Sequence, residues 1–526
     1  MSLPSTGRTT AARLLGAARE RVRIDARSLA LFRVLAGALI VADVLLRSRN
    51  LVFFYTDDGV VPTSLAIAAE PAAAYSIHTL AATPAATAAL FGATALVGGA
   101  LAIGYYTRLV TPLAFLLVVS LDLRNPFVLS FADTLFAALL FLAVFLPLGE
   151  RWSVDAVASD RPRRDSVAGV ATALVLAQMV TMYLVNGYHK TASERWWSGE
   201  AAVLILGIDE MTLPLGDALR ASPTLLQVGG LVWFGMLLGS WLLVALRDRP
   251  RHLLVASFAV AHLSMALTVR IGAFAYVCLA GLTLFVQPSA WRDARSLRRR
   301  LTLMPVGGSR LARLRAGAVA VAERAPRPTP SVRRHRSVDL TRRNVAVAVG
   351  VVALVGLGAV ASLSALGVVD EDSPQSELST GATALVEFQT DWSIFAPHPR
   401  TTDRYYVFSA RTTDGDLIDV RNDRELTYDR PADRLQTQHA TYRERFYMGS
   451  LRRVDGDVAD RLAEHVCETY ETDEGASLTH VNMYAVTEQI TRETIDDHAG
   501  RERSVSRISM HGCGDAAPTA IDPPEE

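Results

Sequence analysis

The uncharged run at residues 344–369 constrains the fold more than any other feature of the sequence. It holds 26 residues without one charged side chain, and an α-helix needs only roughly 20 apolar residues to cross a bilayer. In lipid, every backbone polar group must find a partner inside the protein, which a helix provides. We therefore expect an integral membrane protein.

Eight shorter apolar runs precede this one and predict further spans. Their expected bounds are 29–47, 82–104, 108–122, 132–148, 167–187, 223–246, 252–269 and 272–288. Runs of this kind indicate an all-α polytopic membrane bundle over residues 29–288, followed by a ninth transmembrane helix at 344–369.

The distribution of arginine predicts the orientation. Residues 288–343 contain 15 arginines and 3 acidic residues, whereas residues 370–526 contain 32 acidic residues and 16 arginines. Basic segments beside spans stay preferentially in the cytoplasm. We therefore expect a cytoplasmic N-terminus (1–28), a basic cytoplasmic linker (289–343) that favours anionic lipid over nucleic acid, and an acidic extracytoplasmic domain (370–526) in a multi-pass cell-membrane protein.

The acidic domain has mixed periodicity. The stretch "YYVFSARTTDGDLIDV" alternates around Asp414 and Gly415, which is typical of a β-hairpin, and "DVADRLAEHVCETY" has helical spacing. These patterns predict a small α+β domain. If this domain is extracytoplasmic, Cys467 and Cys513 lie in an oxidising compartment and are expected to form a disulfide.

One residue type is almost absent from the chain. Lys190 is the only lysine among 53 basic residues, and it ends an apolar run just before two tryptophans. In one interpretation it snorkels to the interface beside an aromatic belt. In the other it supplies an amine, which can lose its proton when it is removed from water, as an arginine cannot. Asn186 lies four residues earlier and shares its helix face.

Other polar groups lie at membrane depth and are candidates for a site or for paired structural charges. They are Gln178, His189, Asp133, Arg33, Asp43, His262 and Arg270. Phosphate-binding loops, nucleophile elbows and zinc-protease motifs are absent. No set of His, Cys, Asp and Glu residues has the spacing of metal ligands, so no bound metal is expected.

Three stretches resemble one known family. They are "LFRVLAGALIVADVLLRSRNLVFFYTDDGVVPTS", "LRNPFVLSFADTLFAALLFLAVFLPLGERWSVD" and "QMVTMYLVNGYHKTASERWWSGEA". Together they look like the horizontally transferred transmembrane (HTTM) domain, the prokaryotic relative of vitamin K-dependent gamma-glutamyl carboxylase, over roughly residues 25–290. Its best markers here are Tyr55, Gly59, Pro62, Asn125, Trp152, Ser153, Val154, Asp155, Lys190, Trp197 and Gly199.

The resemblance implies a carboxylase-like lyase or quinone epoxidase. In that family, oxygenation of a reduced naphthoquinone (of menaquinone or vitamin K type) is coupled to proton abstraction from glutamate, and an intramembrane lysine is the base. Lys190 falls at the matching position. The family's supporting histidine corresponds to Ala132, so Asp133 becomes the candidate partner. The family's large lumenal domain has no counterpart, which argues against peptide carboxylation.

The expected site therefore has two parts, in a pocket opening outward among spans one, four, five and seven. The candidate catalytic residues are Lys190, Asp133 and His189. The candidate substrate-binding residues are Arg33, Asp43, Tyr55, Asn125, Asn186, Trp197 and His262.

The tail carries a second, fainter resemblance. "FQTDWSIFAPHPRTTDRYYVF" is similar to bacterial single-span proteins with a Trp-x-x-Phe-Ala-Pro-x-Pro motif. The simpler interpretation is that Trp392 and Phe395 dock the domain onto the membrane surface.

Two functions compete. The first is a quinone-using membrane enzyme with Lys190 as base. The second is a non-catalytic protein that binds lipid or quinone, or that presents its acidic domain to an extracytoplasmic protein or peptide. A transporter is disfavoured because the chain has no internal repeat.

Overall fold

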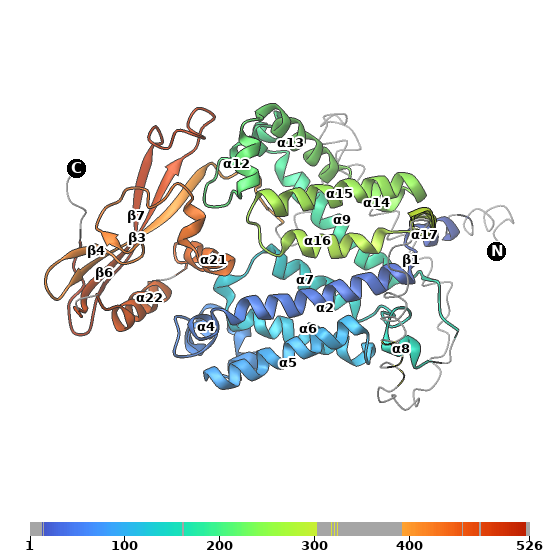
Figure 1. Ribbon diagram of the computed structural model, residues 1–526, viewed down its shortest axis with the longest axis horizontal. Helices are drawn as coiled ribbons and strands as arrows, with labels where there is room; N and C mark the ends of the chain where they lie inside the picture. Colours follow the sequence, from blue (N-terminus) through green and yellow to red (C-terminus); the bar gives the residue numbers. More distant parts are fainter. Residues whose placement is uncertain are drawn as a thin grey trace, which may run out of the picture.

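The computed structural model describes residues 15–159, 162–301, 392–454, 456–472 and 475–521, and residues 13, 317, 320 and 323 singly. The expected ninth span and most of the basic linker lie outside the described residues. Figure 1 shows a helical bundle with the C-terminal domain at one end and the first described residues at the opposite end.

Each of the eight expected spans before residue 288 corresponds to a helix, with bounds that differ by a few residues. These helices are α2 (Ala26–Ser48), α5 (Pro84–Ile103), α6 (Thr107–Arg124), α7 (Phe131–Ala143), α9 (Val170–Lys190), α13 (Pro223–Leu238) with α14 (Leu242–Ala245), α15 (Asp248–Thr268) and α16 (Phe274–Leu282).

In the part of the chain that the structure describes, fewer membrane spans are confirmed than we expected. In the described part of the chain, α2, α5, α9 and α15 are long and apolar enough to cross a membrane. The count reaches six if two bent pairs of helices each form one span: α12 (Pro214–Arg220) with α13, and Phe274–Phe285 with Pro288–Leu297. The expected eight are thus not confirmed, because α7 has only 13 residues, about 20 Å, and α6 contains Pro112 and three ionisable side chains.

Short elements connect the long helices. They are β1 (Ile24–Asp25), α3 (Leu51–Tyr55), α4 (Thr63–Ala69), η1 (Pro71–Tyr75), η2 (Ile77–Leu80), η3 (Pro126–Val128), α8 (Val154–Val157), β2 (Ser166–Val167), α10 (Glu194–Trp197), α11 (Glu200–Leu206), η4 (Thr283–Phe285) and α17 (Pro288–Leu301). β1 pairs antiparallel with β2, which ties the start of α2 to the segment before α9.

Small residues bring α2 and α5 into close contact. A Cβ atom placed on Gly37 would lie 2.5 Å from the carbonyl oxygen of Gly98 and 2.5 Å from the backbone nitrogen of Ala102. No other residue fits at this crossing, which matches the preference for small residues where membrane helices approach closely.

The C-terminal domain is α+β, as predicted. Its strands are β3 (Thr402–Thr412), β4 (Leu417–Asp419), β5 (Arg424–Glu425), β6 (Leu478–Gln489) and β7 (Arg503–Gly512), and its helices are η5 (Leu435–Gln438), α21 (Tyr442–Ser450) and α22 (Gly456–Thr469). They form one antiparallel sheet in the order β5-β4-β3-β6-β7. The predicted hairpin is confirmed: β3 pairs with β4 across a turn in which Gly415 has φ +94°.

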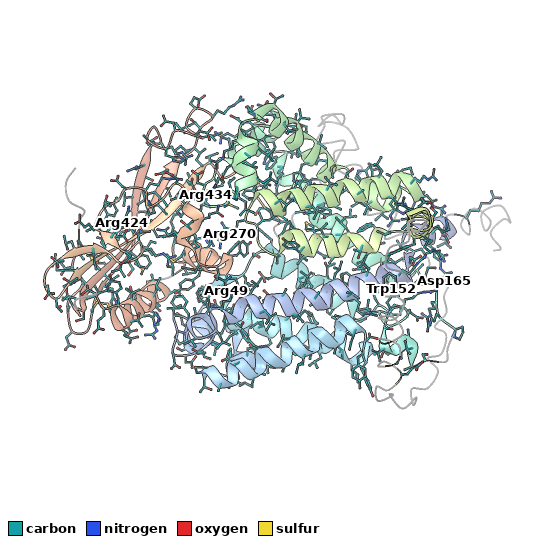
Figure 2. The ribbon with its side chains drawn as sticks, viewed as in Figure 1. Arg49, Trp152, Asp165, Arg270, Arg424 and Arg434 are labelled. Atoms are coloured by element: carbon teal, nitrogen blue, oxygen red, sulfur yellow. A yellow bond between two sulfur atoms is a disulfide. The ribbon has the colours of Figure 1, made fainter. Side chains whose placement is uncertain are left out.

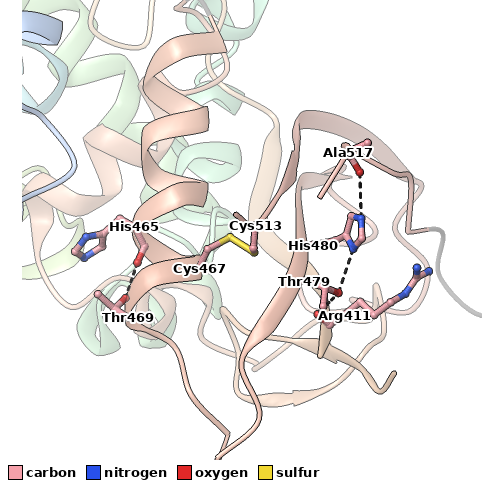
Figure 3. Close-up of a disulfide and its surroundings, with 8 residues drawn as sticks. All are labelled: Arg411, His465, Cys467, Thr469, Thr479, His480, Cys513 and Ala517. Atoms are coloured by element: carbon pink, nitrogen blue, oxygen red, sulfur yellow. Dashed lines mark hydrogen bonds between the residues drawn. A yellow bond between two sulfur atoms is a disulfide. The ribbon is translucent and has the colours of Figure 1, made fainter. Parts of the chain in front are cut away.

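The predicted disulfide is also confirmed. Cys467 on α22 is bonded to Cys513, the residue after β7 (Figure 3). The bond links a helix to an edge strand of the sheet.

A hydrophobic core crosses the junction between the two parts. Phe54, Tyr55 and Val60 from the segment after α2 share a buried cluster with Tyr447 of α21 and Leu462 of α22. The C-terminal domain is therefore packed onto the end of the bundle by the hydrophobic effect.

Candidate functional site

Lys190 is the last residue of α9, and its side chain is 1% exposed. Its Nζ donates a 2.9 Å hydrogen bond to Oδ1 of Asn186, one turn earlier, and another to the backbone carbonyl oxygen of Ile394. Nζ also lies 4.4 Å from the centroid of the Trp196 ring, within cation–π range. All of these neighbours are uncharged.

The segment beginning at Trp392 covers this lysine. Asn186 Nδ2 donates to the carbonyl oxygens of Trp392 at 2.6 Å and Ile394 at 3.0 Å, and Trp196 Nε1 donates to that of Phe395 at 3.2 Å. Trp392 is 2% exposed and packs against Phe131. The tail motif thus docks onto α9 and α10 of the bundle, not onto the lipid surface that we expected.

A second polar cluster lies at the end of α2 that faces the C-terminal domain. Arg47 donates to Asp43 at 2.7 Å, to Asp133 at 3.2 Å, and to Asp122. Arg443 of α21 donates to Asp43 at 2.6 Å and to Asp133 at 2.8 Å. We call these five residues the arginine–aspartate cluster.

Asp133 belongs to this cluster and makes no ion pair with Lys190 in the described residues. Its second carboxylate oxygen accepts hydrogen bonds from the backbone and side chain of Ser130, which form the N-terminal cap of α7. The expected partnership of Asp133 with Lys190 is therefore absent, because two arginines and a helix cap already occupy the carboxylate.

A cavity of about 710 Å³ extends from the cluster along α2. Its walls are mostly apolar and include Leu35 and Leu39 of α2, Phe136 of α7, and Val277 of α16. Most small-molecule sites combine such walls with a few polar groups. The cavity borders spans one, three, four, seven and eight and α21. Of the expected spans one, four, five and seven, only span five contributes no residue to its wall.

The expected site residues divide between these two places. Asp43, Tyr55 and Asp133 line the cavity, as does Arg270, whereas Lys190 does not. Asn186 stays with Lys190, and His189 contacts the ring of Tyr188 on the same helix. No residue of α9 lines the cavity, so Lys190 and the cavity are separate places.

The remaining candidates have local structural partners. Arg33 is buried and donates to the carbonyl oxygens of Leu148, Arg151, Ala102 and Trp152. Figure 2 shows Trp152 at the end of the bundle away from the C-terminal domain. Arg33 does not line the cavity. 

Asn125, Trp197 and His262 also lie outside the cavity. Asn125 bonds to Phe54 O, Trp197 to Thr191 O, and the ring of His262 to the hydroxyl of Tyr183 at 2.8 Å. These contacts hold backbone segments and rings together within the bundle.

A family model described as "HTTM domain" matches residues 22–291. This chain belongs to the HTTM family. The matched region contains every long helix of the bundle and ends within α17. No curated protein and no solved structure matches the chain.

Buried acidic residues form a further contact between the HTTM domain and the C-terminal domain. Asp403 of β3 accepts hydrogen bonds from the backbone nitrogens of Asp209 and Glu210, each at 2.9 Å. Burial and, after it, the neighbouring Asp209 carboxylate together raise the pKa of Asp403 to about 7. Burial opposes ionisation of Glu210 as well, but Arg400 and Arg445 outweigh it and bring the pKa of Glu210 to about 2.

Sequence reasoning missed Arg47, Asp122 and Arg443. Arg47 stands four residues after Asp43, which is the spacing of a helical ion pair, and Asp122 is an ionisable residue in an apolar run. Both signals were available within the HTTM domain. Arg443 had no local signal, because its partners lie 400 and 310 residues away in the chain.

Proposed function

We propose that this HTTM protein binds an amphipathic molecule, a lipid or a quinone, in the cavity beside α2, and that its C-terminal domain covers the polar end of that cavity. The observation that carries the proposal is the cavity itself: an apolar chamber of about 710 Å³ that ends at the arginine–aspartate cluster. An amphiphile matches both parts of the chamber. Its apolar chain covers the apolar wall and shields it from water, and its polar head contacts the hydrogen-bonding groups.

The chamber is open towards the bilayer as well as towards the cluster. Leu46 of α2 is 59% exposed and Tyr276 of α16 is 50% exposed, and both line it. A molecule dissolved in the membrane reaches such a site without passing through water. Catalysis is not required for this function.

The proposal also places the C-terminal domain outside the cell. The Cys467–Cys513 disulfide supports this location, because disulfides persist in oxidising compartments. The arginine-rich residues 288–343 favour the cytoplasm for the segment that precedes it.

Filling the chamber tests the proposal. Ala38 and Ala42 lie on the open wall of α2, whereas Ala89 of α5 is exposed but does not line the chamber. Purified wild type, Ala38→Phe, Ala42→Phe and Ala89→Phe would be extracted with organic solvent, and bound lipids and quinones identified by mass spectrometry. We expect wild type and Ala89→Phe to retain a compound that both lining variants lose. Equal retention in all four proteins would refute binding in the chamber.

A second candidate function is the quinone-dependent reaction with Lys190 as base. The observation in its favour is that the Lys190 amine is buried among uncharged groups, with no carboxylate in ion-pair contact in the described residues. In this function the segment at Trp392–Phe395 must move, because it covers the amine.

Epoxide formation tests this candidate. Wild type and Lys190→Arg would each receive reduced naphthoquinone and oxygen, with the epoxide followed by mass spectrometry. Arginine keeps the positive charge but is a far weaker proton acceptor. Epoxide from wild type alone would support Lys190 as a base. Its absence from both folded proteins would leave binding as the better proposal.

A further inference from the structure

We infer that the occupant of the chamber is an anionic phospholipid taken from the bilayer, held at its phosphate by Arg49 and Arg270. This inference rests on the proposed function, since it names the class of molecule that the chamber would bind. The charges at the mouth of the chamber and the shape of its wall both fit such a molecule.

Arg49 and Arg270 stand at the same level of the molecule. Arg49 follows the last residue of α2, and Arg270 lies in the turn between α15 and α16. Both line the chamber, and Figure 2 shows both at the junction between the bundle and the C-terminal domain. The ends of membrane helices lie at the depth of lipid headgroups.

These two guanidinium groups have no carboxylate partner within the described part of the chain. Arg270 donates only to the carbonyl oxygens of Gln436 and His439, and the side chain of exposed Arg49 has no hydrogen bond or ion pair to a described residue. Burial lowers the pKa of Arg270, and repulsion from Arg445 and Arg49 lowers it further, although the carboxylates of Glu444 and Glu210 act in the opposite direction. A bound anion would relieve this repulsion.

The charge of the whole lining also favours an anion. Its ionisable carboxylates are Asp43, Asp122 and Asp133, and its arginines are Arg47, Arg49, Arg270 and Arg443. Three negative charges against four positive ones leave a net charge of one positive. The three carboxylates are engaged by Arg47 and Arg443, so the other two arginines remain for a ligand. Guanidinium groups pair with phosphate through two parallel hydrogen bonds.

The apolar wall below the arginines has the dimensions of an acyl chain. Lining residues of α2 run from Leu35 to Leu46, which spans about 16 Å of helix at 1.5 Å per residue. Tyr276 and Leu279 of α16 face the same chamber. An anionic phospholipid places its phosphate between Arg49 and Arg270 and its acyl chains along this wall.

Lipid titration of delipidated protein, followed by native mass spectrometry, tests the inference. The probes are dioleoylphosphatidylglycerol, which is anionic, and dioleoylphosphatidylcholine, which has the same chains and no net charge. We expect wild type to prefer the anionic lipid and Arg49→Gln to lose about fivefold of its affinity for that lipid alone, since an arginine near a lipid headgroup contributes about this factor. Arg195→Gln is the matched control, because Arg195 is exposed at the start of α10 and does not line the chamber.

Four outcomes would overturn the inference. If Arg195→Gln weakens binding of the anionic lipid as much as Arg49→Gln does, the preference comes from the general surface charge of the protein. If inorganic phosphate displaces the anionic lipid, the arginines recognise phosphate rather than a lipid. If both lipids bind equally and Ala42→Phe removes both, the chamber binds amphiphiles but does not select an anionic headgroup. If Ala42→Phe affects neither lipid, the proposed function fails as well.

Discussion

The amine of Lys190 donates a hydrogen bond to the backbone carbonyl oxygen of Ile394, a residue 204 positions further along the chain. The only lysine of the protein and the tail motif around Trp392 therefore form one contact. This contact, together with the bonds from Asn186 and Trp196, fastens the C-terminal domain to α9 and α10.

Replacing Lys190 with methionine should loosen this attachment. Methionine fills a similar volume but leaves Asn186 Oδ1 and the Ile394 carbonyl without their donor, which costs about 1–3 kcal/mol when such groups stay buried. Amide hydrogen exchange should rise in residues 392–399 relative to wild type. Arg195→Met, at an exposed position, serves as the control. Unchanged exchange in that segment would show that Lys190 does not hold it.

Removing Arg443 should destabilise the junction through the arginine–aspartate cluster. Arg443→Met leaves Asp43 and Asp133 short of a positive partner, and breaking a buried ion pair in this way costs roughly 3 kcal/mol. Chemical unfolding in detergent would measure the loss, with exposed Arg453→Met as control.

The double variant Arg443→Met with Asp133→Asn separates this pairing from general loss of packing. Because the two side chains are in contact, the combined loss should be smaller than the sum of the single losses. Strict additivity would mean that the two residues stabilise the junction independently.

The Asp403 carboxyl should give the junction a specific pH dependence. Its folded-state pKa of about 7 lies above the ordinary value of 3.8, so the folded protein holds its proton over a range where the unfolded chain has lost it. The stability from this group is fully present below about pH 4 and is lost as the pH rises to about 7.

Asp403→Asn imitates the protonated form and should remove this slope. The melting temperatures of wild type and variant would be compared from pH 4 to pH 8, because their difference isolates Asp403 from other titrating groups. Relative to that of wild type, the free energy of unfolding of the variant should increase by at most about 1.4 kcal/mol for each pH unit up to pH 7. Two parallel curves would contradict the expectation.

Breaking the disulfide should destabilise the C-terminal domain. Cys467 and Cys513 close a loop with a sequence separation of 46 residues, for which chain entropy predicts a loss of roughly 3–4 kcal/mol in Cys467→Ser. Thermal unfolding with and without reductant would measure it. Reductant should lower the melting temperature of wild type and leave that of the variant unchanged. An equal response of both proteins would contradict a structural role for the bond.

The amino-acid sequence by itself determined the membrane character, the positions of the helices, the family and the α+β class of the tail. Each follows from local properties: long apolar runs, helical spacing, alternation around Asp414 and Gly415, and ordered motifs. The contact between Asp43 and Arg47 also follows from local sequence, because residues four apart on one helix are neighbours on its surface.

Only the tertiary structure decided which polar groups meet. Asp133 was a candidate partner for Lys190 because it stands next to Ala132, the position of the family's supporting histidine, yet its carboxylate binds Arg443, 310 residues away in the chain. Hydropathy and periodicity indicate the environment that a side chain prefers, but they do not identify the residue that it contacts there. The separation of Lys190 from the cavity, and the docking of Trp392 over it, arise from packing between segments that the sequence pattern treats as independent.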